Sequence, residues 1–487
     1  MNKRQYKSGI DRQQEYLLAP RVEEYVSQEN PVRAIDSYVE SLDLEQMGFE
    51  NAGGEITPGQ PAYAPEGLLK LYLYGYLHRV RSSRRLEAEC QRNLEVMWLL
   101  GGLRPGYKTI ADFRKANLKA LKKVNQDFVQ MCKELELFGG ELVGIDGSFF
   151  RGNVGKDHIY TEERLERALG HIEKDITRYL KELEEVDQEE EKKPRPEDQE
   201  LATKLERLRE RQQKHSQQLQ ELKESGKTQI AEVDPDARRL SKPGQGTIAG
   251  YNVQTAVDDK HKLLVICDVV QDGNDENQLA PMALAAKKVL GVETLETTQD
   301  LGYFNGQQIK TCIEHGIIPY VPEPDRQGSF PRRQFQYDPV GNCYHCPAGK
   351  KLTYQGTCQD SGRTYWRYRS SQVDCAQCPF KPKCLPGKTQ YRILTRWEHE
   401  AILEAHRERM AKDGAKKMRR RAELCEHPFG TIKLWCGWTH FLLRGLEKVR
   451  GEMNLLMLCF NFKRVLSILG LADFQAYCAR RNNPIGC

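Results

Sequence analysis

The chain changes its hydrophobic period near residue 140, and this change constrains the fold more than any other feature. Short β-branched runs bounded by glycine or polar residues occupy residues 141–150, 250–258, 262–270, 294–300 and 316–322. Helical patterns at 277–290 and 305–316 separate the later runs. The order of three strands, a helix, a strand, a helix and a strand predicts an α/β domain with a mixed sheet.

Ahead of this domain, residues 65–135 carry apolar residues at three- and four-residue intervals, with a break at 101–106. Thr109 followed by Asp112 resembles a capping box with Asp in place of Glu, which predicts a helix from about there to the glycines at 139–140. We therefore expect a small all-α N-terminal domain over residues 1–138.

Two segments do not fit the sheet pattern. Residues 161–227 show apolar positions in a 4-3-4-3 spacing on both sides of a proline-containing acidic stretch, which predicts an inserted antiparallel helical hairpin with its tip near Pro194. A disordered charged loop is the alternative. The second segment, residues 325–395, is rich in Pro, Gly, Cys and aromatic residues, and we expect it to form a separate Cys-rich insertion.

Composition bounds the class of protein. A chain of 487 residues is long enough for two to four domains. No apolar run approaches the roughly 20 residues of a membrane helix, and the N-terminus lacks an apolar signal core, so we expect a cytoplasmic protein. The net charge of +5 is too small to indicate a nucleic-acid partner by itself, but basic residues cluster at 79–85 and 416–421.

Three carboxylates are candidates for a shared site. Asp146 and Asp300 each end an apolar strand pattern, where ligands are usually met in an open sheet, although a single strand-end Asp is more often a structural cap. Glu426 lies in a basic helical pattern with Lys433 seven residues later on the same face. Three such carboxylates suit two Mg²⁺ ions that cleave a phosphodiester, and Lys433 would hold a substrate phosphate.

Seven motifs in order then identify a family. The stretches at 64–93, 109–115, 144–153, 250–258, 300–309, 425–435 and 441–464 resemble the transposases of bacterial insertion sequences in the eleven-eighty-two group, over about residues 15–465. This resemblance implies an RNase H-like catalytic domain with a DDE triad at Asp146, Asp300 and Glu426. Glu423 lacks the E-H-P-F-G context of Glu426. Related transposases often carry an Arg four residues before the Glu, where this chain has Ala422 preceded by Arg421.

The cysteines indicate a second kind of metal site. Fifteen cysteines, several in CxxC pairs and without a secretion signal, favour reduced thiols and metal binding over disulfides. The resemblance points to a structural Zn²⁺ on four of them rather than on Cys343, and the alternative is a set of reduced thiols in a loop-rich segment. The predicted ligands are Cys346, Cys375, Cys378 and Cys384.

Basic residues of the N-terminal helices are the candidates for binding double-stranded DNA at the terminal inverted repeats of the element. The alternative is a plain helical domain with a solvated basic face. Contacts of this kind to phosphates give affinity but no sequence code. The predicted DNA-binding residues are Arg79, Arg81, Arg84, Arg85, Lys108, Arg114 and Lys115, with Arg421 and Lys433 beside the carboxylates.

The sequence thus predicts a transposase that excises and integrates an insertion sequence with two Mg²⁺ ions, which Mn²⁺ can replace, and that pairs element ends as a homodimer on DNA before joining them to target DNA. The alternatives are an RNase H-like nuclease without strand transfer, a non-catalytic DNA-binding derivative, and, more distantly, a zinc-dependent regulator. The expected catalytic domain comprises residues 139–160, 228–324 and 396–470, followed by a tail at 471–487.

Overall fold

The computed structural model describes residues 21–53, 61–188, 196–242, 246–324, 330, 332–360, 362–385, 387–435 and 437–482. Its contacts divide the chain into two compact units. The first comprises Met1–Cys132 and Arg450–Cys487, and the second comprises Lys133–Val449. Among the described helices, no single one is long and apolar enough to cross a membrane, although the bent pair Leu446–Leu469 and Leu471–Asn482 passes that test jointly.

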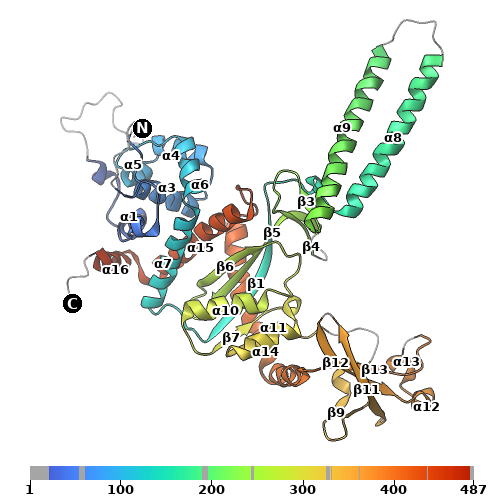
Figure 1. The fold of residues 1–487 in the computed structure, drawn as a ribbon. Helices are drawn as coiled ribbons and strands as arrows, with labels where there is room; N and C mark the ends of the chain where they lie inside the picture. The colour runs from blue at the N-terminus through green and yellow to red at the C-terminus, as the bar shows by residue number, and fades with distance from the viewer. Residues whose placement is uncertain are drawn as a thin grey trace, which may run out of the picture. The chain divides into compact units, whose positions relative to one another are not determined.

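The first unit is helical, as the sequence predicts (Figure 1). The α3 helix begins with Pro65, which suits the first turn because it needs no backbone N–H there. Its elements are η1 (Val22–Tyr25), α1 (Val32–Glu40), α2 (Leu44–Met47), α3 (Pro65–Leu77), α4 (Ser83–Arg92), α5 (Leu94–Leu99), α6 (Tyr107–Ala116), α7 (Leu118–Glu134), α15 (Leu446–Leu469) and α16 (Leu471–Asn482).

Aromatic side chains form the centre of this unit. The Tyr38 ring packs edge-on against Phe128 and Phe462, and its hydroxyl donates a hydrogen bond to the carbonyl of Val124. The single helix predicted from Thr109 to about residue 138 is wrong, because the buried Asn117 separates α6 from α7.

The C-terminal helices belong to this unit from Arg450 onward. The sequence prediction had instead placed residues up to 470 in the catalytic domain and the rest in a tail. The buried Glu452 explains the grouping, since its carboxylate lies 3.6 Å from a guanidinium nitrogen of Arg81. Asn454 likewise accepts a hydrogen bond from the side chain of Asn125.

The second unit is built on a six-stranded mixed sheet. The strands are β1 (Leu142–Arg151), β4 (Arg238–Lys242), β5 (Gly246–Asp258), β6 (Leu264–Val270), β7 (Leu295–Thr298) and β8 (Ile317–Tyr320). The β5 strand pairs antiparallel with β1, β4 and β6, while β1, β7 and β8 are parallel. The predicted α/β class and mixed sheet are confirmed, and the order β6-β5-β1-β7-β8 is consistent with an RNase H-like fold.

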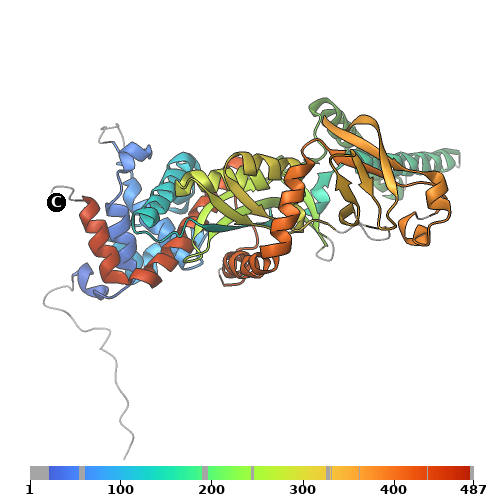
Figure 2. The same cartoon turned by 90° about the horizontal axis from the view of Figure 1, so that it is seen from below.

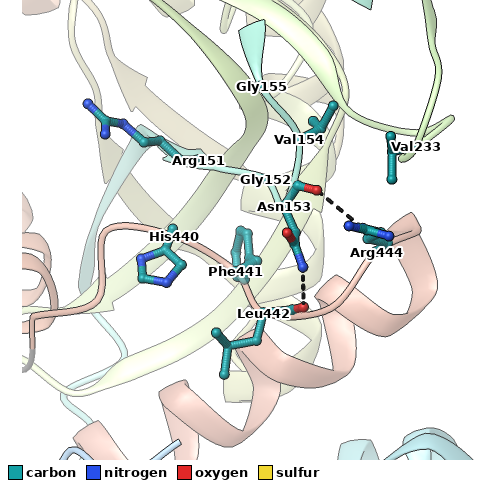
Figure 3. Close-up of a pocket in the computed structure, with 10 residues that line it drawn as sticks. All are labelled: Arg151, Gly152, Asn153, Val154, Gly155, Val233, His440, Phe441, Leu442 and Arg444. Atoms are coloured by element: carbon teal, nitrogen blue, oxygen red, sulfur yellow. Dashed lines mark hydrogen bonds between the residues drawn. The ribbon is translucent and has the colours of Figure 1, made fainter. Parts of the chain in front are cut away.

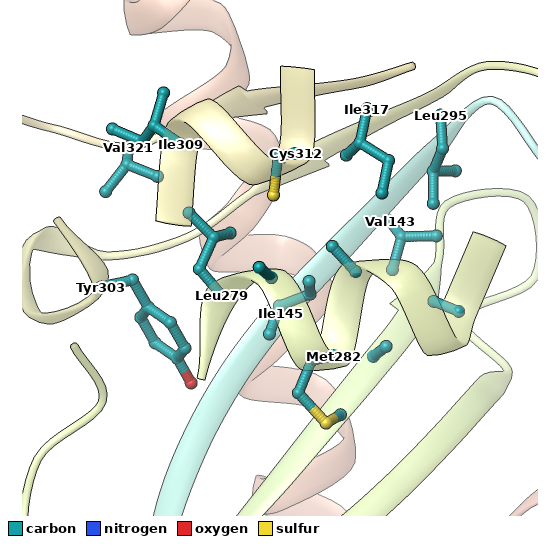
Figure 4. Close-up of a cluster of buried hydrophobic side chains, with 14 of the residues drawn as sticks. Val143, Ile145, Leu279, Met282, Leu295, Tyr303, Ile309, Cys312, Ile317 and Val321 are labelled. Carbon is teal, nitrogen blue, oxygen red and sulfur yellow. The ribbon is translucent and has the colours of Figure 1, made fainter. Parts of the chain in front are cut away.

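Helices cover both faces of this sheet because side chains alternate along each strand. Val143 and Ile145 of β1 point into an apolar core formed with α10 (Leu279–Leu290) and α11 (Gly306–Glu314), as Figure 4 shows. Leu142, on the alternate face, packs against α14 (Glu400–Gly430), which lies on the other side of the sheet (Figure 2). Any polar residue at an even-numbered position of β1 therefore faces α14.

A helical hairpin is inserted between β1 and β5. Its arms, α8 (Glu162–Gln188) and α9 (Pro196–Ser225), run side by side in Figure 1. The short strands β2 (Ile159–Tyr160) and β3 (Ile230–Ala231) pair antiparallel and close its base, so the chain leaves and rejoins the sheet at neighbouring points. The predicted tip near Pro194 lies outside the described residues.

The Cys-rich segment forms a second sheet that the sequence did not predict. Five antiparallel strands follow the order β13-β12-β11-β10-β9. They are β9 (Gln336–Asp338), β10 (Cys343–His345), β11 (Lys351–Asp360), β12 (Arg363–Ser370) and β13 (Ile393–Trp397), and Leu352 and Tyr368 anchor their core. The short helices α12 (Gln372–Ala376) and α13 (Lys381–Cys384) lie between β12 and β13.

Candidate active site

Asp146 and Asp300 hold equivalent positions on two parallel strands. The pairing of β1 with β7 ends where Gly144 is matched with Thr298, so both aspartates lie two residues beyond the last matched pair. Asp146 does not end its strand, as the sequence suggested, because β1 continues to Arg151 through its pairing with β5. Asp300 caps a 3-10 turn by accepting a hydrogen bond from the backbone of Gly302 at 2.9 Å.

Helix α14 closely approaches the face of β1 that carries Asp146. A Cβ atom added to Gly144 would lie 2.9 Å from the sulfur of Cys425 and 3.0 Å from Cβ of Leu424, closer than the packing tolerates. Glycine at this position therefore allows the helix to contact the strand backbone. The next residue on the same face is Asp146.

Basic residues of α14 fix the helix to the sheet through ion pairs. Lys417 pairs with Glu296 on β7, and Arg420 pairs with Asp259 beyond β5. The basic run that the sequence suggested as a nucleic-acid feature thus contributes at least these two residues to internal pairs. Their alignment along the helix sets the rotation at which α14 presents its following residues to β1.

Arg421 joins the two aspartates. Its Nη2 atom lies 3.1 Å from Oδ1 of Asp146 and 3.6 Å from Oδ2 of Asp300. Burial acts to lower the pKa of Arg421, but the negative charges of Asp146 and Asp300 outweigh it and the pKa is raised. Arg421, predicted as a DNA contact, supplies the positive charge between these carboxylates.

Glu426 is exposed and follows Cys425 on α14. Burial raises the pKa of the Cys425 thiol, and the negative charges of Asp146, Asp300 and Glu426 raise it further. All three predicted carboxylates therefore lie within electrostatic reach of one buried sulfur. Glu423, the competing residue, pairs instead with Arg420.

Lys433 reaches the same strand from a π-helical turn, η5 (Thr431–Trp435), which directly follows α14. Its ammonium donates hydrogen bonds to the hydroxyl of Ser148 at 2.6 Å and to the carbonyl of Phe149 at 2.8 Å. Ser148 lies two residues after Asp146, on the same face of β1. The predicted pairing of Glu426 and Lys433 along one helix face is wrong in form, because the helix changes its pitch between them.

A fourth carboxylate, Asp275, was missed by the sequence reasoning. It is buried and accepts hydrogen bonds from the amides of Asn252 at 2.8 Å and Gln254 at 2.7 Å. A Cβ added to Gly302 would lie 3.9 Å from Oδ2 of Asp275 and 3.1 Å from Oδ1 of Asp300, so the two carboxylates flank one glycine. The available signal was a pair of amides at alternate positions of an otherwise apolar strand.

Tyr303 connects this network to the aspartates. Its hydroxyl donates a hydrogen bond to the side-chain oxygen of Gln254, whose amide nitrogen donates to Asp275. Burial raises the pKa of Tyr303, as do the charges of Asp275, Asp146 and Asp300. The tyrosine therefore remains a neutral hydrogen-bond donor beside a concentrated negative charge.

The donor set fits divalent cations of the Mg²⁺ class. Carboxylate oxygens are the ligands that Mg²⁺ and Mn²⁺ prefer. Asp146 and Asp300 already direct one oxygen each toward a common positive group, the guanidinium of Arg421. The residues that would hold the ions are Asp146, Asp300 and Glu426.

Four cysteines of the second sheet line one small cavity of about 30 Å³. They are Cys346, Cys375, Cys378 and Cys384. Burial raises the pKa of Cys384, Arg392 opposes this shift, and the other three thiols add to it. The backbone of Lys350 donates to the sulfur of Cys346 at 3.3 Å, a hydrogen bond that also stabilises a thiolate. Four thiols around one cavity fit a structural zinc ion.

The predicted DNA-binding residues of the first unit separate into two groups. Arg79, Arg84, Arg85, Lys108 and Lys115 are exposed. Arg84 lies over the ring of the exposed Tyr107, which brings the beginnings of α4 and α6 together. Arg114, by contrast, is buried against Tyr72 and Tyr76, and Arg81 pairs with the buried Glu452. Both guanidiniums are committed to the interior, so assigning them to DNA contacts is corrected.

An open groove of about 550 Å³ lies at the far end of β1 (Figure 3). Arg151, His440 and Arg444 line it, and all three are exposed. The backbone holds the groove together, since Arg444 donates to the carbonyl of Asn153 at 3.2 Å and Asn153 donates to the carbonyl of Leu442 at 3.0 Å. The sequence reasoning did not identify these basic residues.

Two family models match the chain. Residues 20–116 match a transposase domain (DUF772), and residues 345–466 match a transposase DDE domain. The chain thus carries two transposase segments, and the activity that they imply at the level of the family is DNA transposition. The second segment contains Glu426, Lys433 and the four cysteines, whereas Asp146 and Asp300 lie outside both.

The comparison with solved structures finds a likeness to a piggyBac transposase synaptic complex with hairpin DNA, determined by cryo-EM. The sequence identity is 10%, the TM-score is 0.31, and the alignment covers 93% of this chain and 79% of the other. A likeness this distant carries no argument about the site. Among curated proteins, none matches the chain.

Proposed function

We propose that the chain is the transposase of an insertion sequence, which cleaves DNA at the element ends and joins the freed ends to a target. The observation that carries this proposal is the equivalent register of Asp146 and Asp300 beside the helix that bears Glu426. The transposase DDE segment at 345–466 supports it independently, because that segment includes Glu426.

The reaction has two steps at one site. In the first, a water oxygen attacks phosphorus at the element end, the bond from phosphorus to O3′ breaks, and a 3′-hydroxyl is released. In the second, this hydroxyl attacks a target phosphodiester and displaces a target 3′-oxygen. Two Mg²⁺ ions, replaceable by Mn²⁺, when held by the three carboxylates would activate the attacking oxygen and stabilise the leaving one.

The protein's own groups position the scissile phosphate. Lys433 lies beside Ser148 on the face of β1 that carries Asp146, where its charge attracts a phosphate oxygen. Arg421, which neutralises Asp146 and Asp300, adds a second positive group for the substrate phosphate. The network of Asp275 holds Tyr303 rigidly beneath the aspartates.

Double-stranded DNA is the proposed partner, at the terminal inverted repeats and at the target. The exposed basic residues around Arg84 and Tyr107 are the proposed contact of the first unit. In the second unit, the groove lined by Arg151 and Arg444 begins at the end of the strand that carries Asp146 and offers a path for a phosphate backbone. We further propose that a homodimer pairs the two ends, in the cytoplasm of a bacterial cell.

A structural zinc ion completes the proposal. The convergence of Cys346, Cys375, Cys378 and Cys384 on one cavity supports it. Four thiolates leave no open coordination position, so this ion would hold α12 and α13 against the second sheet and would take no part in cleavage.

The test is a strand-transfer assay with the purified full chain, labelled DNA that carries the ends of the element, and a supercoiled target plasmid. We expect Mg²⁺-dependent 3′-hydroxyl ends, followed by covalent transfer of the label to the plasmid. Cleavage without joining would identify a hydrolytic nuclease. Binding of the ends without cleavage would identify a non-catalytic DNA-binding derivative.

A further inference from the structure

The turn between β9 and β10 brings together three side chains that no part of the proposed reaction uses. Asp338 and Cys343 face each other across the two strands, and His345 lies two residues beyond Cys343. Side chains two apart on a strand share a face, so the register alone directs all three to one point. Tyr344, between the two ligands on β10, points to the opposite face and is buried in the core of the sheet.

The spacing of the three donor atoms suits one metal ion. The sulfur of Cys343 lies 3.8 Å from Oδ2 of Asp338 and 3.8 Å from Nε2 of His345, and the last two atoms are 4.0 Å apart. A point equidistant from the three atoms is about 2.2 Å from each, which agrees with zinc bond lengths of roughly 2.0–2.3 Å to oxygen, nitrogen and sulfur.

The turn preorganises Asp338 for this role. Its Oδ1 atom accepts hydrogen bonds from the backbones of Val340 and Gly341, each at 3.0 Å, so that Oδ2 is directed toward Cys343 and His345. Gly341 leaves the necessary space, because an added Cβ would lie 2.5 Å from Oδ2 of Asp338 and 3.3 Å from the sulfur of Cys343.

Hydrogen bonds hold the rest of the turn. Asn342 has a left-handed backbone with φ of 42°, and its side-chain oxygen accepts hydrogen bonds from the hydroxyls of Tyr337 at 3.1 Å and Tyr368 at 2.6 Å. Two tyrosines of the buried core thereby fix the residue that precedes Cys343. A rigid ligand set loses little conformational entropy when an ion binds.

We propose that Asp338, Cys343 and His345 form a second metal site, separate from the four-cysteine cavity, which binds one divalent transition-metal ion of the Zn²⁺ class. The thiolate and imidazole ligands select such an ion over Mg²⁺ or Ca²⁺. Three protein ligands leave a fourth position for water. Within the described residues this is the group of His, Cys, Asp and Glu side chains whose ligand atoms lie within 4.8 Å of one another.

The experiment counts metal ions on the full chain. Protein stripped with a chelator is titrated with Zn²⁺ under reducing conditions, and Co²⁺ serves as the optical probe of thiolate ligation. Cys343→Ser and His345→Gln each remove one ligand, and Gly341→Ala obstructs the site without removing any. Cys358→Ser is the matched control, since Cys358 lies in the same sheet outside both groups of ligands. Cys378→Ser disables the four-cysteine cavity.

We expect two Zn²⁺ ions per wild-type chain and per Cys358→Ser chain, and one fewer for Cys343→Ser and His345→Gln. Gly341→Ala should weaken the same ion at least 10-fold. In Cys378→Ser, the remaining Co²⁺ spectrum should retain a single thiolate contribution that Cys343→Ser removes. The proposal is overturned if folded Cys343→Ser and His345→Gln proteins both bind as much Zn²⁺ as wild type. Loss of zinc only in Cys378→Ser would overturn it equally. Neither outcome depends on DNA cleavage, so the proposal stands or falls apart from the proposed transposase activity.

Discussion

Arg421 bridges to Asp146 with 3.1 Å between Nη2 and Oδ1, and the same nitrogen lies 3.6 Å from Asp300. The two aspartates therefore already share a positive charge before any metal ion binds. A divalent ion must compete with this guanidinium for the same oxygens, which makes Arg421 a direct determinant of metal affinity.

Replacing Arg421 by Ala should increase the thermal stabilisation that Mg²⁺ confers, because the ion no longer competes with an internal cation. Cleavage should fall all the same, by about 10–100-fold, since a positive group near the phosphate is lost. Thermal unfolding with and without Mg²⁺ measures the first effect. Arg419→Ala, an exposed position on the same helix, is the control and should change neither quantity.

Asp275→Asn should reduce cleavage by about 10–100-fold through misplacement of Tyr303 and the aspartates. The amide cannot accept from both Asn252 and Gln254 as the carboxylate does, and the buried mismatch should cost about 1–3 kcal/mol of stability. A shift in the Mg²⁺ concentration needed for half-maximal cleavage separates a positioning role from simple destabilisation. An unchanged Mg²⁺ dependence in a folded variant would restrict Asp275 to a structural role.

The pH dependence of the hairpin base follows from Glu232. Burial acts to raise the pKa of Glu232, but hydrogen bonds from Lys214 and His158 outweigh it and lower the pKa to about 2. A lowered pKa contributes stability that is full above the ordinary value of 4.5 and is lost as the pH falls toward about 2. The difference between wild type and Glu232→Gln should therefore be constant from pH 7 to 5 and shrink below about 4.5.

Hydrogen exchange at the paired backbones of β2 and β3 measures this difference locally. Glu224→Gln, a change of an exposed carboxylate near the end of α9, is the matched control and should not alter exchange at the base. A difference between wild type and Glu232→Gln that grows on acidification would contradict the assigned role of Glu232.

Binding of end DNA should separate exposed from buried basic residues. The triple substitution of Arg84, Arg85 and Lys108 by Ala should reduce the dependence of binding on salt by up to about three phosphate contacts, roughly 0.9 each in the slope of log K against log salt. Arg114→Ala should destabilise the helical unit instead and leave the slope unchanged. Lys122→Ala, on the exposed side of α7, controls for net charge. Equal slopes for the triple variant and wild type would remove this surface from the DNA contact.

The sheet was predictable because its strands and helices each carry a clear period. Residues 277–290 and 305–316 read as helices in sequence and fold as α10 and α11, and the five β-branched runs all became strands. The second sheet escaped prediction because its strands are short, exposed and interrupted by turns. In β11, for example, Leu352 is buried while most of its neighbours face solvent, so no apolar alternation is visible.

The site was predictable as residue types but not as contacts. Asp146 and Asp300 stood out as polar residues after apolar runs, yet their equal register depends on how far β1 pairs with β7. Arg114 and the exposed Lys115 are adjacent and look alike in sequence. Only the packing of Tyr72 and Tyr76 decides that Arg114 lies in the interior.

The central claim is that Asp146, Asp300 and Glu426 form one metal-dependent site, and single-turnover cleavage of labelled element ends tests it most directly. Asp146→Asn, Asp300→Asn and Glu426→Gln each remove an anionic ligand at nearly constant shape. Each should lower cleavage by more than about 100-fold while binding of end DNA persists. Glu423→Gln, one turn earlier on the same helix, should cleave like wild type. Wild-type cleavage by any one of the first three variants would contradict the account.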